Sequence, residues 1–81
     1  MIEQNIQVNS LFEPNEAARV VQTASKFASR ISLVQGEKTA NAKSIMGIIS
    51  LDLRGGQTVK IVADGDDAQQ ALPELSQILS A

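Results

Sequence analysis

Four segments of the chain carry the short-period apolar pattern that is typical of β-strands. Residues 1–8 alternate, and one face of the predicted half-buried strand consists of Ile2, Gln4, Ile6 and Val8. Residues 31–34 and 38–42 flank a turn at 35–37, so together they predict a β-hairpin. The fourth strand is expected at 58–63.

Three further segments repeat apolar residues at helical spacing. The main amphipathic helix is predicted over residues 14–29, because Pro14 suits a first helical turn and apolar positions recur from Ala17 to Ala28. A short helix is expected from Ser44, and a last one after Asp66 or Asp67 as its N-cap. Inside that last helix Pro73 costs about 3 kcal/mol. We therefore expect a kink or a late helix start there.

The predicted order is strand, helix, strand, strand, helix, strand, helix. Four strands with one apolar face need cover from the helices, which predicts an α/β (α+β) two-layer sandwich with one open sheet face. The 81 residues suffice for one domain, 1–81, and are too few for two. Because Phe12 and Phe27 are the only aromatic residues, the core must be built from aliphatic side chains.

The segment from Lys43 to Leu51 combines a serine with a dense apolar run. The Ser44 hydroxyl is suited to accept a hydrogen bond from a backbone N–H of the first helical turn. A phosphate on Ser44 would be stabilised at that terminus by roughly 0.3–1 kcal/mol. If Ile48 and Leu51 face the core, other apolar residues of the run must be exposed and indicate a docking surface. These residues are Ile45, Met46 and Ile49.

Composition and charge exclude several classes of function. The net charge is −2 without a basic cluster, which argues against direct nucleic-acid binding. No apolar run approaches the roughly 20 residues of a membrane span, and we expect a cytoplasmic protein. The absence of histidine excludes a histidine general base and a phosphohistidine. The acids at 64–67 are interpreted as a turn, so no metal or cofactor is expected.

The motifs at 21–27 and 38–47 resemble the HPr phosphocarrier family of the bacterial sugar phosphotransferase system. These motifs read Val-Gln-Thr-Ala-Ser-Lys-Phe and Lys-Thr-Ala-Asn-Ala-Lys-Ser-Ile-Met-Gly. The likeness extends over nearly the whole chain. It implies the HPr-like open-faced βαββαβα sandwich, in which three helices cover one face of a four-stranded antiparallel sheet.

The resemblance fails at the phosphocarrier motif. In HPr proteins a histidine at the start of the first helix, within Gly-Ile-His-Ala-Arg-Pro, passes phosphate from enzyme I to sugar-specific proteins. Here Glu13 stands at the expected histidine position, and Asn15 and Glu16 replace the arginine and proline. Both the phosphate acceptor and its cationic neighbour are therefore gone. No catalytic residue and no enzymatic activity are expected.

The second functional position of the family is kept. In Gram-positive HPr and its histidine-lacking catabolite-repression paralogue, HPr kinase/phosphorylase modifies the serine of Lys-Ser-Ile-Met-Gly, and the phosphoprotein docks on the catabolite control repressor. That serine corresponds to Ser44. The resemblance implies a regulatory corepressor whose docking patch adds Pro14 and Ala18 to the exposed residues of the short helix. The alternative is a phosphate-independent interaction domain. A homodimer also stays open, because an exposed apolar helix suits self-association.

Overall fold

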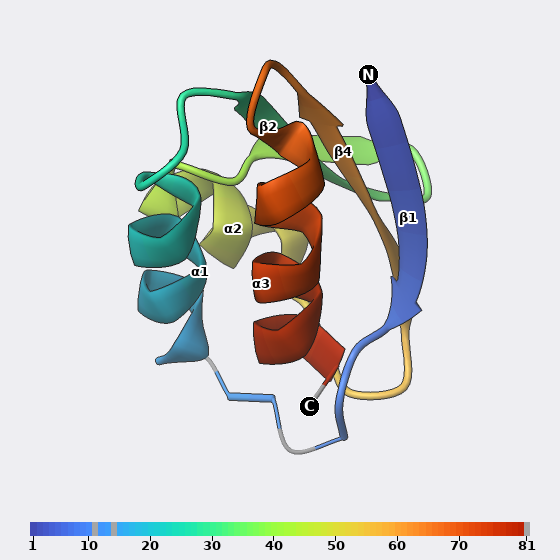
Figure 1. Ribbon diagram of the computed structural model, residues 1–81. Coiled ribbons are helices and arrows are strands. Elements are labelled where there is room, and N and C mark those ends of the chain that lie inside the picture. The colour runs from blue at the N-terminus through green and yellow to red at the C-terminus, as the bar shows by residue number, and fades with distance from the viewer. Residues whose placement is uncertain (11, 14, 81) are drawn as a thin grey trace.

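The computed structural model describes residues 1–10, 12–13 and 15–80. Its elements follow the predicted order of strand, helix, strand, strand, helix, strand and helix (Figure 1). Their bounds are β1 Ile2–Gln7, α1 Glu16–Ala24, β2 Arg30–Gln35, β3 Lys38–Asn41, α2 Ile45–Leu51, β4 Thr58–Asp64 and α3 Ala68–Ser80.

The four strands form one antiparallel sheet in the order β1-β4-β2-β3. Strands β2 and β4 lie in the middle, while β1 and β3 form the edges. All three helices lie on one side of this sheet, and the other side is open (Figure 1). Helix α3 packs on β1 and β4, whereas α2 packs beside β3 at the far edge. The predicted α+β open-faced sandwich is confirmed.

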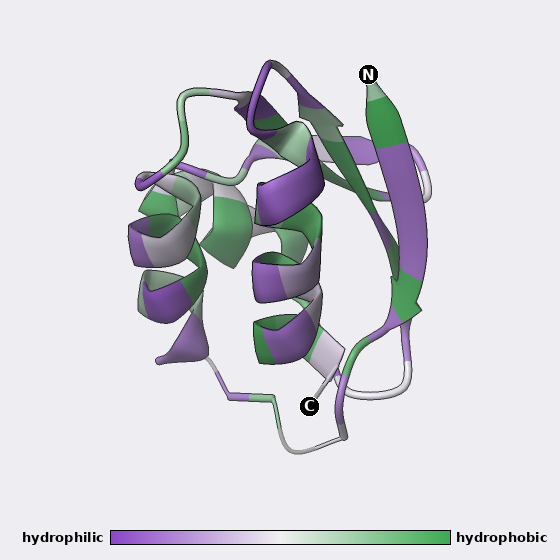
Figure 2. Ribbon diagram, in the orientation of Figure 1, coloured by the Kyte–Doolittle hydropathy of each residue, from purple (hydrophilic) through white to green (hydrophobic). Residues whose placement is uncertain are grey.

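The core lies between the sheet and the helices and is aliphatic. Almost fully buried in this one cluster are Ile31 and Leu33 of β2, Ile61 of β4, and Leu75 and Leu79 of α3. Figure 2 shows the corresponding apolar stripes on the helices and strands, with polar residues on the outer sides of the helices. The alternation predicted for the last strand is confirmed. In β1 the prediction holds less well, because Gln4 is exposed although it shares a face with buried Ile6.

The first helix is shorter than the predicted 14–29, since α1 ends at Ala24. Ala28 is exposed and Ser29 is buried outside the helix, so the apolar spacing at the end of this segment was misleading. Two distant side chains hold the segment after the helix. The Lys43 ammonium donates to the Phe27 carbonyl at 2.7 Å, and the Asp67 carboxylate accepts from the Ala28 N–H at 2.8 Å.

Asp66 or Asp67 was predicted to be the N-cap of the last helix, and α3 begins directly after Asp67. The carboxylate of Asp67, however, binds the turn before β2. It accepts hydrogen bonds from the Ala28 and Ser29 N–H groups and from the Ser29 hydroxyl. Charge-assisted bonds of this kind favour the ionised carboxyl. The Ser29 hydroxyl, followed by the Ala28 N–H, therefore holds the pKa of Asp67 below its ordinary value of 3.8.

The alternative of a late start for the last helix is wrong. Helix α3 begins at Ala68 and continues through Pro73 to Ser80. The buried side chains of Ala68 and Ala71 precede the proline, and Leu72 is buried directly beside it. Packing of this first turn and a half against the sheet outweighs the hydrogen bond that the proline cannot donate. The proline ring itself is exposed.

We expect Asp67→Asn to lower the melting temperature at neutral pH, because both carboxylate oxygens accept hydrogen bonds from the turn. The amide keeps one acceptor oxygen, its NH2 group cannot accept, and the remaining bonds lose the charge. A carboxyl whose pKa is lowered by folding stabilises the fold above its unfolded pKa and loses this contribution as the pH falls through the folded pKa. The difference from wild type should therefore shrink below pH 3.8. Thermal unfolding between neutral pH and pH 2 measures this. Asp66→Asn, one residue away and exposed, is the matched control; an equal effect of both variants would contradict the assignment.

Candidate functional site

Ser44 lies at the N-terminus of α2 and caps it as predicted. Its backbone is extended, with φ −113° and ψ 114°, and its hydroxyl oxygen accepts from the Gly47 N–H at 3.2 Å. The preceding turn is fixed by Asn41, whose side-chain oxygen accepts from the Lys43 N–H at 2.8 Å and whose carbonyl accepts from the Ser44 N–H at 3.0 Å. The short helix therefore starts from a well-defined position at the end of β3.

The seven residues of α2 cannot bury all their apolar side chains. Ile48 and Leu51 face the core and are 2% and 3% exposed. Ile45, Met46 and Ile49 are 39%, 71% and 57% exposed, as the sequence predicted. We call these three residues the α2 patch. The patch begins directly after Ser44, at the first residue of the helix that this serine caps.

A small apolar groove of about 120 Å³ continues the α2 patch toward α1. Ile49 belongs to both the patch and the groove. Phe12 and Leu53, which line the groove, were not foreseen as site residues, although Phe12 is one of only two aromatic residues in the chain. The lining residues are Phe12, Ala17, Ile48, Ile49, Asp52 and Leu53.

The start of α1 carries the remaining predicted site residues. Ala18 is exposed on α1, directly after Ala17, which lines the groove beside Ile49. Pro14, also predicted for the docking patch, lies outside the described residues. Glu13 is exposed one turn before the helix, and its carbonyl accepts from the Glu16 N–H at 2.9 Å. The position expected for the family histidine therefore lies on a different helix terminus from Ser44.

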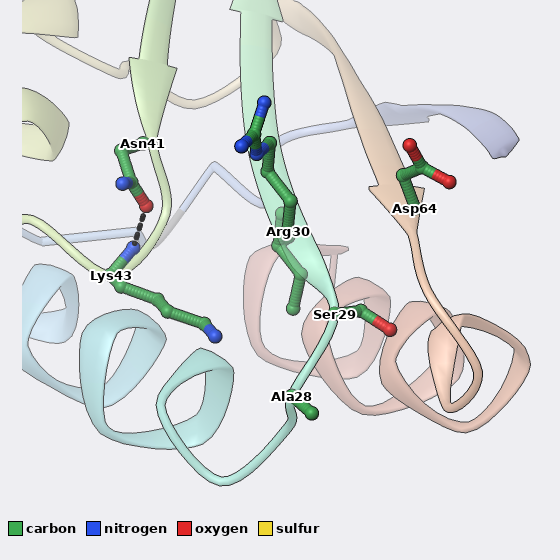
Figure 3. Close-up of a pocket in the computed structure, with 7 residues that line it drawn as sticks. Ala28, Ser29, Arg30, Asn41, Lys43 and Asp64 are labelled. Atoms are coloured by element: carbon green, nitrogen blue, oxygen red, sulfur yellow. Dashed lines mark hydrogen bonds between the residues drawn. The ribbon is translucent and has the colours of Figure 1, made fainter.

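A larger, polar hollow of about 600 Å³ opens at the ends of β2, β3 and β4 (Figure 3). Its two cations do not converge, because Arg30 extends along the sheet while the Lys43 ammonium reaches the Phe27 carbonyl. Asp64 lies opposite them on β4. Across the described residues, no group of three potential ligands is placed to hold a metal ion. No described helix is both long and apolar enough to cross a bilayer.

Comparison with known proteins places these features in a family context. Residues 12–81 match the model of the PTS HPr family, described as "PTS HPr component phosphorylation site". The HPr-like protein Crh of Bacillus subtilis is 38% identical over 78 residues, which cover 94% of this chain and 92% of Crh. The HPr-like protein Crh of Halalkalibacterium halodurans is 36% identical over 77 residues, which cover 93% of this chain and 92% of that relative.

Two solved structures share the fold. The crystal structure of the phosphocarrier protein HPr from Bacillus anthracis is 38% identical and has a TM-score of 0.89, covering 98% of this chain and 96% of that one. The crystal structure of Crh from Bacillus subtilis, a dimer with a swapped domain, is 36% identical with a TM-score of 0.76. It covers 96% of this chain and 87% of that one.

Ser44→Ala should destabilise the protein by about 0.5–2 kcal/mol, because the Gly47 N–H loses its side-chain acceptor. Denaturant unfolding measures the change. Ser50→Ala is the matched control, since the exposed Ser50 hydroxyl only bonds back to the Met46 carbonyl within the helix. Equal stability of wild type and Ser44→Ala would show that the cap contributes nothing. Ser44→Ala also serves below as the variant that cannot be phosphorylated. Its measured loss of stability separates the effect of the lost cap from the effect of the lost phosphate.

Proposed function

The chain belongs to the HPr family of the phosphotransferase system, and on this premise we propose that it is a regulatory protein of the cytoplasm, switched by phosphorylation of Ser44. Proteins of this family are phosphocarriers or regulators and are not catalysts in themselves. One observation carries the proposal. The chain contains no histidine, yet it keeps the serine that caps α2 directly beside an exposed apolar patch.

A phosphocarrier role does not fit the start of α1. Carrying a phosphoryl group from enzyme I requires the family histidine, and Glu13 occupies that position here. Asn15 offers a neutral amide where the family has a guanidinium, so a phosphoryl group near Glu13 would lack its cationic neighbour. We therefore propose that the protein neither transfers phosphate nor acts as an enzyme.

Phosphorylation of Ser44 would change the charge of the surface that contains the α2 patch. A phosphoserine carries about −1.5 to −2 charges at neutral pH and several strong acceptor oxygens. A partner with a basic pocket beside an apolar surface can bind both features at once. By resemblance to the family, we propose HPr kinase/phosphorylase as the modifying enzyme and the catabolite control repressor as the partner. Pro14 and Ala18 complete the proposed docking surface.

The exposure of the α2 patch also supports a second candidate function. Ile45, Met46 and Ile49 are exposed without any phosphate on Ser44, so a partner can reach them in the unmodified protein. Since Asn15 replaces the family arginine, contacts that depend on that cation are also lost. The alternative is therefore an interaction domain that binds its partner through apolar contacts alone. In this alternative, Ser44 is only a helix cap.

We further propose that the protein forms a homodimer. The crystal structure of the similar Crh from Bacillus subtilis is a dimer, which supports self-association of this chain. The α2 patch is one candidate surface for the contact, because it exposes apolar area. Self-association is independent of the proposed switch, since neither requires the other.

Incubation with HPr kinase/phosphorylase and ATP should add one phosphate, and it should be located on Ser44. Intact mass and peptide mapping measure this. Ser44→Ala should remain unmodified while Ser50→Ala is modified like wild type. A conventional HPr phosphorylated in parallel shows that the kinase is active. Absence of phosphate from the wild-type chain under those conditions would contradict the switch and favour the phosphate-independent domain.

Phosphorylated protein should bind the catabolite control repressor at least about tenfold more tightly than unmodified protein, or about 1.4 kcal/mol. Ile49→Ser should weaken that binding by about 1–2 kcal/mol, because it removes an exposed apolar contact. Calorimetric titration measures both differences. Gln77→Ser, on the exposed side of α3, is the control and should bind like wild type. If Ser44→Ala binds as well as the phosphoprotein, the switch mechanism is wrong.

A further inference from the structure

Met46 is the most exposed residue of the α2 patch. It is 71% exposed, against 57% for Ile49 and 39% for Ile45. Met46 and Ile49 lie three residues apart on one helix, so their side chains are neighbours on its surface. A thioether reacts directly with peroxides, unlike the aliphatic side chains beside it. The α2 patch therefore contains one side chain whose polarity can be changed by a covalent reaction.

Few other side chains of this protein compete for an oxidant. Cysteine and methionine are the side chains on which protein oxidation most often acts, and the chain has no cysteine and only two methionines. The second one, Met1, is 78% exposed and precedes β1. Strand β1 and helix α2 lie at opposite edges of the sheet, as Figure 1 shows. Of the two accessible thioethers, only Met46 belongs to the proposed docking surface.

We propose that Met46 is an oxidation site, and that its conversion to methionine sulfoxide by hydrogen peroxide weakens docking on the α2 patch. The sulfur lone pair attacks one peroxide oxygen, so that an S–O bond forms while the O–O bond breaks. The proton of the transferred oxygen passes to the leaving hydroxide, which departs as water. The sulfur is oxidised by two electrons and the peroxide is reduced. Methionine sulfoxide reductases reverse the modification.

This inference rests on the docking role proposed above and adds a regulation of the same surface. A sulfoxide oxygen is a hydrogen-bond acceptor at a position that was apolar. An apolar partner surface would bury this oxygen without offering a donor, and burying an unsatisfied polar group is unfavourable. The oxidised patch should therefore bind its partner more weakly than the reduced patch.

Oxidation of Met46 leaves the supports of α2 in place. The buried residues of this helix are Ile48 and Leu51, so the sulfur of Met46 lies outside the core. Ser44 caps the helix through the Gly47 N–H, and the Ser50 hydroxyl donates to the backbone carbonyl of Met46 at 2.8 Å. Neither hydrogen bond involves the thioether. We therefore expect the oxidised protein to keep its fold and its cap.

The two modifications of this helix would act in opposite directions. Phosphorylation of Ser44 adds a charge that a basic pocket can bind, whereas oxidation of Met46 removes an apolar contact. The sulfoxide is uncharged, so it leaves the charge of the phosphate unchanged. A protein that carries both modifications should bind its partner less tightly than one that carries the phosphate alone.

Peptide mapping after brief treatment of the full chain with hydrogen peroxide tests the reactivity of Met46. Met46 and Met1 should each gain one oxygen atom at comparable rates, because both are exposed. Met1 thus serves as the reference within the same molecule. A Met46 that stays reduced while Met1 is fully oxidised would overturn the proposal. Circular dichroism should give the same melting temperature before and after oxidation, and unfolding on oxidation would also overturn it.

Calorimetric titration with the catabolite control repressor tests the effect on docking. The protein is first phosphorylated on Ser44 and then divided into a reduced and an oxidised portion. Oxidation should raise the dissociation constant at least about tenfold, and treatment with methionine sulfoxide reductases should restore it. In Met46→Leu the ratio of the constants after and before peroxide treatment should be one, whatever the affinity of this variant, because its patch has no sulfur.

The outcomes separate this inference from the function on which it rests. If the reduced phosphoprotein binds the repressor and the oxidised phosphoprotein binds it equally well, the inference is wrong and the proposed function stands. An equal loss of affinity on oxidation of Met46→Leu would assign the effect to Met1 and would overturn the role of Met46. If the reduced phosphoprotein does not bind, the proposed function fails, and the regulation of its docking surface fails with it.

Discussion

The apolar inner face of the sheet has to be buried beneath the three helices. Which strands each helix packs on determines which apolar side chains enter the core and which stay on the surface. Helix α3 is long enough to lie over β1 and β4, and it buries a continuous aliphatic stripe. Helix α2 is only seven residues long and packs at the far edge, where two of its apolar side chains suffice. The apolar residues left over become surface. An exposed apolar patch is thus a direct result of placing a short apolar helix at the edge of the sheet.

Most of this architecture could be predicted from residue patterns, because alternation and helical spacing report local burial. All seven elements and the Ser44 cap followed from such local signals. The end of α1 did not, because Ala28 and Ser29 are bonded to Asp67, which lies nearly forty residues later. The apolar groove was missed for the same reason. Phe12 and Leu53 line one groove only after α1 and α2 have packed, and no local spacing indicates that they lie around the same hollow.

The arrangement is also compatible with the proposed loss of one family function without the other. Glu13 precedes α1 and Ser44 precedes α2, so each position depends on its own helix terminus. Changes at 13–16 leave the hydrogen bonds between Asn41, Lys43 and Ser44 intact. The sheet and the core that support both termini are aliphatic and do not involve either position. A chain can therefore lose phosphate transfer and retain an intact serine site.

The hydrogen bond at Ser44 has one more consequence. The hydroxyl oxygen accepts from the Gly47 N–H, so the bond uses a lone pair and not the hydroxyl proton. A phosphate ester replaces that proton and leaves the oxygen in place as an acceptor. The helix would then stay capped after modification, and its backbone would not have to unwind. Phosphorylation of such a serine would change the surface charge and leave the backbone conformation unchanged. A partner would then distinguish the two forms by the phosphate itself.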